Sequence, residues 1–169
     1  GEVVVFNPPL QSHEVWIKRV VGLPGDRIQM KEGILYINGQ ACSLAKIQDF
    51  VDHLKLVGNS REENREYNEK GEIISAFMQH LPEGLEHPII KSEPFGKARL
   101  DNTREFIVPE GHYFMMGDNR DGSGDSRLEQ SVGFIPDENL VGRAEIIFFS
   151  TTARWWEFWK WPAAIRYNR

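Results

Sequence analysis

Short apolar runs separated by turn-forming residues are the feature that most constrains the fold of this chain. Each run has the length of a β-strand, and regular helical periodicity is scarce. The pair Asn38-Gly39 favours a type I′ hairpin turn, because both residues tolerate positive φ. The sequence therefore predicts a mainly β, antiparallel fold. The first predicted strands are Val3–Phe6, Val15–Val21, Arg27–Met30 and Ile34–Ile37.

The chain divides into three regions that differ in polarity and in the regularity of their apolar runs. We predict a discontinuous antiparallel β core formed by residues 1–39 and 106–154. Residues 40–105 are more polar and less regular, and we interpret them as an inserted, smaller β-rich lobe. Residues 155–169 form an aromatic C-terminal tail.

Local patterns make further predictions in the middle and second half of the chain. Apolar residues spaced as on one helix face over Ile47–Leu54 indicate an amphipathic helix. The charged stretch Ser60–Lys70 indicates a solvated loop. Further strands are predicted at Phe106–Val108, Tyr113–Met116 and Ala144–Phe149.

Composition excludes several classes of protein. The net charge of −5 and the pI of about 5.6 argue against a nucleic-acid binder, whose domains usually carry a basic excess. The single Cys42 forms neither an internal disulfide nor a zinc site, and we expect it to be a small buried residue. No apolar stretch approaches the ~18 residues of a membrane span. Because Gly1 opens directly into a strand, we expect a fragment whose targeting or membrane segment lies upstream.

The tail concentrates four of the five tryptophans of the chain. Tryptophan next to lysine and arginine is typical of a membrane–water interface. The same rings could instead cover the β core as a lid, and the sequence leaves both interpretations open. The four residues are Trp155, Trp156, Trp159 and Trp161.

Lys18 is the first candidate for chemistry, because it lies within the apolar segment Trp16–Val21. Burial disfavours an ammonium ion and lowers the pKa of a lysine from about 10.4. A lysine with a pKa near ~7–8 can remove a proton from a hydroxyl at neutral pH. A solvent-facing strand lysine is the alternative. Since strand residues alternate between faces, Lys18 and Arg19 point to opposite sides of the sheet.

The second candidate is the polar, glycine-rich loop 117–127. Its spacing fits neither an EF-hand, since Arg120 and Gly122 fall where acidic ligands belong, nor a phosphate-binding loop. Asp125 and Arg127 could form an ion pair, and the serines could take part in chemistry. A purely structural loop remains possible. The five histidines lie in polar or loop contexts and suggest neither a catalytic triad nor a metal site.

Taken in order, these segments closely resemble the bacterial type I signal peptidases, which are membrane-bound endopeptidases of the Ser-Lys type. The resemblance rests on Gly-Glu-Val-Val-Val-Phe at 1–6, Ile-Lys-Arg-Val-Val-Gly-Leu-Pro-Gly-Asp at 17–26 and Gly-Asp-Asn-Arg-Asp at 117–121. Gly-Phe-Ile-Pro at 133–136 and Leu-Val-Gly-Arg-Ala at 140–144 extend it. It is close over 1–39 and about 101–150, and the tail is similar to that of Gram-negative members.

The resemblance implies a role for particular residues. Lys18 corresponds to the general base of the family, and Ser123 to the serine that orients this lysine. The pair of Asp125 and Arg127 resembles a structural salt bridge of the family, and Asp118 and Arg120 belong to the same motif. The walls of the groove that accepts an extended substrate correspond to Val4, Trp16 and Ile17.

The resemblance also implies the setting of the reaction. The substrates are the signal peptides of exported preproteins, cut after alanine-sized residues at the outer, periplasmic face of the bacterial inner membrane. No metal, organic cofactor or nucleic acid is involved. Membrane contact is expected through an N-terminal anchor and the tryptophans of the tail.

One departure concerns the nucleophile. The family carries it in a Ser-Met-x-Pro-Thr segment before the first strand, and no Ser-Met-x-Pro occurs in these 169 residues. We therefore expect the isolated chain to be inactive, without nucleophile or anchor. Three alternatives remain: a sibling self-cleaving Ser-Lys protease, a non-catalytic β-rich binding module with an Asp-rich loop, and Ser123 itself as the nucleophile. Gly122, where the family often has Asn, is a smaller departure.

Overall fold

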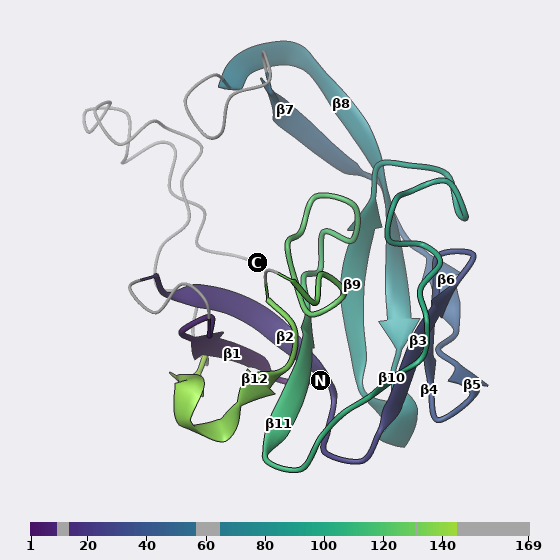
Figure 1. Cartoon of the computed structure of the whole chain (residues 1–169). Coiled ribbons are helices and arrows are strands. Elements are labelled where there is room, and N and C mark those ends of the chain that lie inside the picture. The colour runs from purple at the N-terminus through teal and green to yellow at the C-terminus, as the bar shows by residue number, and fades with distance from the viewer. Residues whose placement is uncertain (10–13, 57–64, 131, 145–169) are drawn as a thin grey trace.

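The computed structural model describes residues 1–9, 14–56, 65–130 and 132–144 (Figure 1). Within these ranges the chain consists mainly of antiparallel strands, with two short 3₁₀ turns at Pro82–Gly84 and Asp137–Asn139. The prediction of a mainly β fold is confirmed. The predicted strand at Ala144–Phe149 and the aromatic tail at 155–169 lie outside the described residues, apart from Ala144 itself.

The first sheet has five strands in the order β12-β11-β2-β1-β13. In β1 and β2, Val4 lies directly opposite Lys18, and Phe6 lies opposite Trp16. Because β1 pairs with β2 on one edge and with β13 on the other, it is an interior strand. The strands are β1 (Val3–Phe6), β2 (Trp16–Gly22), β11 (His112–Met116), β12 (Ile135–Pro136) and β13 (Leu140–Arg143).

The second sheet has the order β10-β3-β4-β5 and contains the tight turn predicted at Asn38-Gly39. Asn38 and Gly39 have φ values of 53° and 82°, as a type I′ turn requires, so the predicted hairpin is confirmed. Its strands are β3 (Arg27–Lys31), β4 (Ile34–Ile37), β5 (Gln40–Ala41) and β10 (Phe106–Ile107).

The third sheet comes from the middle of the chain, where the long strand β8 pairs with β6, β7 and β9. It corrects two predictions. Most of the segment expected to be helical lies in β7, and the part of Ser60–Lys70 from Arg65 onward lies in β8. Backbone pairing with a long partner strand overrides a weak helical periodicity. The strands are β6 (Leu44–Lys46), β7 (Phe50–Leu56), β8 (Arg65–His80) and β9 (Glu86–Lys91).

Two apolar clusters lie on the two faces of β11. In β11, Phe114 and Met116 belong to one cluster, and Met115 between them belongs to the other, as strand alternation requires. The first cluster joins β11 to the sheet of β3 and β4 and includes Cys42, which is buried as predicted. Cys42 and Leu81 belong to this core although both come from residues 40–105. The division into a core of 1–39 plus 106–154 and a lobe of 40–105 stays a prediction.

Candidate active site

Lys18 lies in the middle of β2, on the sheet face that also carries Trp16 and Val4. Its Nζ lies 5.4 Å from the centre of the Trp16 ring. Burial lowers the pKa of Lys18 below its ordinary value of 10.5. The charge of Asp125 opposes this shift, that of Arg127 adds to it, and that of Asp118 opposes it. These three charges belong to the loop 117–127, so the amine lies within electrostatic range of that loop.

Arg19 points to the opposite face of β2 and ties the same loop to the first sheet. Its guanidinium donates two hydrogen bonds of 2.8 Å to the carboxylate of Asp118, one to each oxygen. A third bond, of 2.6 Å, runs from Nη1 to the carbonyl oxygen of Gly1. Such a two-point pair fixes the orientation of both groups. Arg19 therefore fastens the start of the loop to β1 and β2.

The ion pair of Asp125 and Arg127 organises the other end of the loop. Both side chains are buried, and Arg127 Nε and Nη2 donate to the two carboxylate oxygens at 2.8 and 2.7 Å. The carboxylate also accepts from the backbone N–H groups of Gly117 and Arg127. Arg127 Nη2 donates in addition to the carbonyl of Arg120 at 2.7 Å. The pair thus links the start, middle and end of the loop.

Ser123 lies between these two anchors and is half-buried. Its hydroxyl has one weak hydrogen bond, of 3.4 Å, to the carbonyl of the next residue, Gly124. Among the described residues no hydrogen bond joins it to Lys18. A Cβ at Gly117 would lie 2.1 Å from Ser123 Oγ, so the loop brings Ser123 directly against that glycine. Ser126, in contrast, bonds the backbone of Met115 and has a structural role.

Arg120 is buried beneath the loop, and only 2% of its surface is exposed. Its Nη2 donates to Gln79 Oε1 at 2.5 Å, and its Nε donates to the carbonyl of Gly117. Within the described part of the chain it contacts no carboxylate, and its Nη1 has no hydrogen-bond partner. Burial, with the charge of Arg127 adding to it, lowers the pKa of Arg120 to about 10. Arg120 joins the loop to β8.

His87 was expected in a polar or loop context, but it lies buried in β9 with 3% exposure. Its Nε2 lies 3.5 Å from Arg120 Nη2 and 4.0 Å from Asp118 Oδ1. Burial lowers its pKa to about 3, with further lowering by Arg19 and Arg120 and an opposing effect of Asp118. With this pKa the imidazole of His87 is neutral near pH 7. Its buried ring packs against the loop through Arg120 and Asp118.

A buried lysine provides a second link between the loop and the third sheet. Lys91 Nζ donates to Asp101 at 2.8 Å and to Asp121 at 2.7 Å, and each of the three side chains is at most 5% exposed. Backbone bonds run beside it, from Ile90 N to the carbonyl of Asp118 and from Arg120 N to the carbonyl of Ile90. The loop therefore forms a short parallel bridge with β9.

The aspartates of the loop are all engaged by basic side chains, which bears on the cation-binding alternative. Asp118 pairs with Arg19, Asp121 with Lys91, and Asp125 with Arg127. A carboxylate paired with a guanidinium or ammonium group has its charge compensated, so it attracts a metal cation less strongly. In the described ranges no cluster of His, Cys, Asp and Glu side chains forms a candidate metal site.

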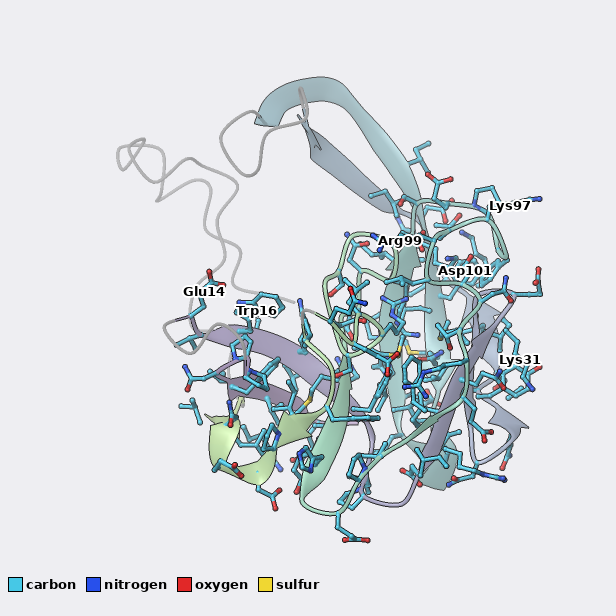
Figure 2. All side chains as sticks on the ribbon, in the orientation of Figure 1. Glu14, Trp16, Lys31, Lys97, Arg99 and Asp101 are labelled. Atoms are coloured by element: carbon cyan, nitrogen blue, oxygen red, sulfur yellow. The ribbon has the colours of Figure 1, made fainter. Side chains whose placement is uncertain are left out.

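The predicted groove residues fall on two faces of the first sheet. Val4 is buried in the apolar cluster of Phe6 and Met115, while Trp16 is half-buried, and its Nε1 donates to Glu14 at 2.7 Å. In Figure 2 Trp16 and Glu14 lie together at one end of the sheet. Ile17 is 56% exposed and, by strand alternation, faces the side opposite to Lys18.

The sequence did not point to the buried partners of the loop. Gln79, His87, Lys91 and Asp101 come from the region 40–105, which we predicted to be an inserted lobe and to which the sequence assigned no role. Lys91 follows the apolar pair Ile89-Ile90 directly, and a charged residue at the end of a buried strand was the one available signal. Its partners are distant in sequence, so only the fold brings them together.

Comparison with known proteins shows the family to which this chain belongs. Residues 1–149 match the family model described as signal peptidase, peptidase S26. The chain therefore belongs to the signal peptidase family S26. It is 38% identical over 161 residues to a signal peptidase I of Rickettsia typhi and 39% identical to one of Rickettsia canadensis; both alignments cover 93% of this chain. A signal peptidase I of Rickettsia bellii is 34% identical over 184 residues and covers 100% of the chain.

The chain spans about half the length of these curated relatives, 54% for the first two and 57% for the third. A crystal structure of a signal peptidase I from Enterococcus faecalis is 24% identical, with a TM-score of 0.44. That alignment covers 85% of this chain and 93% of the other. No helix among the described residues is long and apolar enough to span a bilayer.

Proposed function

We propose that this chain forms part of the active site of a signal peptidase I, which removes N-terminal signal peptides from exported preproteins. The observation that carries the proposal is a lysine with a lowered pKa, held in a strand beside the loop of Ser123. Membership of the signal peptidase family supports it. Lys18 is the general base, and Ser123 orients its amine.

The proposed reaction is an acyl transfer in two stages. The neutral amine of Lys18 takes the proton of a serine hydroxyl while the oxygen attacks the scissile carbonyl carbon. The resulting ammonium then gives this proton to the leaving amine as the peptide bond breaks. Water, activated by the same amine, releases the signal peptide from the serine. A lysine takes the place of the histidine of other serine proteases, and burial, which lowers its pKa below 10.5, favours the neutral amine that the step needs.

The nucleophilic serine belongs, in this proposal, to a Ser-Met-x-Pro segment, which these 169 residues do not contain. The catalytic domain then works at the periplasmic side of the bacterial inner membrane, held by an N-terminal anchor. Tryptophans of the tail add contact with the bilayer. The substrate lies in extended form along the sheet face of Val4 and Trp16, whereas Ile17 lies exposed on the other face of β2.

Lys18 gives the first test. In the full-length protein, kcat/KM against a signal-peptide substrate should rise with pH, because only the neutral amine accepts a proton. The midpoint should lie below 10.5 as a result of the lowered pKa. Lys18→Met should reduce kcat/KM by about 10²–10⁴-fold, the usual contribution of a general base. Lys31→Met, which removes an exposed strand lysine, should change little.

The 169-residue chain alone should show no turnover under the same conditions. Turnover by this chain that Lys18→Met abolishes would overturn the assignment of the nucleophile. A serine-reactive phosphonate, followed by mass spectrometry, would then show whether Ser123 is modified. An unchanged pH profile in full-length Lys18→Met would reject the proposed base.

A further inference from the structure

A pocket of about 300 Å³ lies next to Ser123, between the loop and the segment that precedes Asp101. Its size is at the lower limit of ordinary ligand sites, which occupy ~300–1,000 Å³. Nothing in the proposed mechanism uses it. Its lining consists of Ala98, Arg99, Leu100, Arg120, Asp121, Gly122, Ser123, Gly124 and Leu128.

The charges around this pocket favour an anion. Asp121 is its one acidic lining residue, and Lys91, which also pairs with Asp101, pairs with it at 2.7 Å. Arg120 contributes a cation that contacts no carboxylate in the described part of the chain. Arg99 is exposed and forms no ion pair or hydrogen bond with any other described residue. The lining therefore carries two cations and one carboxylate, and Arg99 provides the exposed positive charge.

The position of the pocket relative to Trp16 indicates which part of a substrate could reach it. The segment 122–124 lines the pocket, and a Cβ at Gly124 would lie 3.9 Å from the Trp16 ring. In Figure 2 Arg99 lies to the right of Trp16. Because Ser123 and Gly124 line the pocket and Gly124 lies next to Trp16, the pocket adjoins the sheet face of Val4 and Trp16.

We propose that this pocket receives the residues that follow the scissile bond, and that Arg99 favours an acidic side chain among them. The inference rests on the proposed function, because Ser123 marks the point of cleavage only if Lys18 is the base. Arg99 would then determine specificity for the residues of the mature protein, which follow the scissile bond. Ala98, Leu100 and Leu128 provide the apolar surface for the aliphatic part of such a side chain.

The test uses full-length protein and pairs of peptide substrates that are identical except for Glu or Lys at one of the first three positions after the cut. We expect the wild type to cleave the Glu peptide of at least one pair about five-fold faster in kcat/KM, as a single partly exposed ion pair provides. Arg99→Gln should abolish this preference, and Arg99→Glu should reverse it toward the Lys peptide.

Lys97→Glu is the matched control. Lys97 is exposed on the same segment and does not line the pocket, so the substitution makes the same change in net charge two residues away. It should leave the preference intact. Arg99 is exposed, so its variants should fold, and unfolding midpoints equal to that of the wild type would verify this.

Two results would overturn the inference while leaving the proposed function in place. One is cleavage of all peptides with no preference, or an unchanged preference in Arg99→Glu. The other is an equal effect of Arg99→Glu and Lys97→Glu, which would indicate long-range charge rather than a site. Failure of the wild type to cleave any peptide would overturn the proposed function, and the inference with it.

Discussion

Lys18 and Arg19 are neighbouring basic residues whose environments differ because a strand directs them to opposite faces. Arg19 is satisfied by a two-point ion pair with Asp118 and by the carbonyl of Gly1. Lys18 has no such partner among the described residues, and burial lowers the pKa of its amine. A single step along the backbone thus separates a structural cation from a candidate base.

The position of Ser123 likewise depends on a single residue, Gly117. A Cβ there would meet Ser123 Oγ at 2.1 Å and Ser123 Cβ at 2.4 Å, far inside van der Waals contact. We expect Gly117→Ala to displace Ser123 and to lower kcat/KM of the full-length protein at least about ten-fold, because ~1 Å of misplacement can cost more than that.

Gly142→Ala is the control for this prediction, since its Cβ would have no described atom within 4 Å. It should retain activity close to that of the wild type. If both alanine variants are equally active, the close approach of Gly117 and Ser123 has no catalytic importance.

At the scale of elements, the third sheet supports the loop rather than standing apart from it. The hairpin of β8 and β9 supplies Gln79, His87 and Lys91, all buried against loop residues. Backbone bonds from Ile90 continue this contact. A region that the sequence suggested was peripheral therefore forms the base on which the loop of Ser123 rests.

Substitution of Lys91 tests whether the third sheet supports the loop. Lys91→Met leaves the carboxylates of Asp101 and Asp121 buried without their cation, and removing one member of a buried ion pair costs about 3–5 kcal/mol. We expect a loss of unfolding free energy of that size in urea denaturation. Adding Asp101→Asn and Asp121→Asn should recover part of it, because the unpaired charges are then gone.

Lys97→Met, at an exposed position nearby, should change the stability by less than about 0.5 kcal/mol. Equal stability of the Lys91 and Lys97 variants would mean that the buried triad contributes nothing to the fold.

For the molecule as a whole, the polar cluster of His87, Arg120, Arg19 and Asp118 joins the first sheet, the loop and β9. His87 and Arg120 are buried, while the side chains of Arg19 and Asp118 are 14% and 42% exposed. The titration of His87 therefore affects global stability rather than a local contact.

Acid should destabilise the protein through His87. The folded pKa of about 3 lies below the ordinary value of 6.5, so the unfolded state binds the proton first as the pH falls. This contribution to stability is intact above pH 6.5 and is lost between 6.5 and 3, at about 1.4 kcal/mol per pH unit. Urea denaturation at several pH values measures how the unfolding free energy changes with pH. Between pH 3 and 6.5 this slope should be shallower in His87→Gln than in the wild type by about 1.4 kcal/mol per pH unit.

His112→Gln should keep the slope of the wild type, since His112 lies outside the cluster and bonds the carbonyl of Glu110. Identical slopes in all three proteins would show that His87 carries no such linkage.

The sequence by itself determined β1–β4, β10, β11 and the turn at Asn38-Gly39, because this turn and the short apolar runs act through local backbone preferences. It did not predict the short strands β5, β12 and β13. It also indicated Lys18 and Ser123, which stand in contiguous motifs. It failed over residues 47–54 and 65–70, where pairing with β8 outweighed local pattern.

Only the tertiary structure decided the partners of the loop and the burial of His87, Lys91 and Arg120. The physical reason is that a hydrogen bond or ion pair between residues such as Gln79 and Arg120 leaves no trace in local sequence. Desolvation likewise depends on the atoms that other strands place around a group. The pKa of Lys18, on which the proposed chemistry depends, therefore became visible only with the fold.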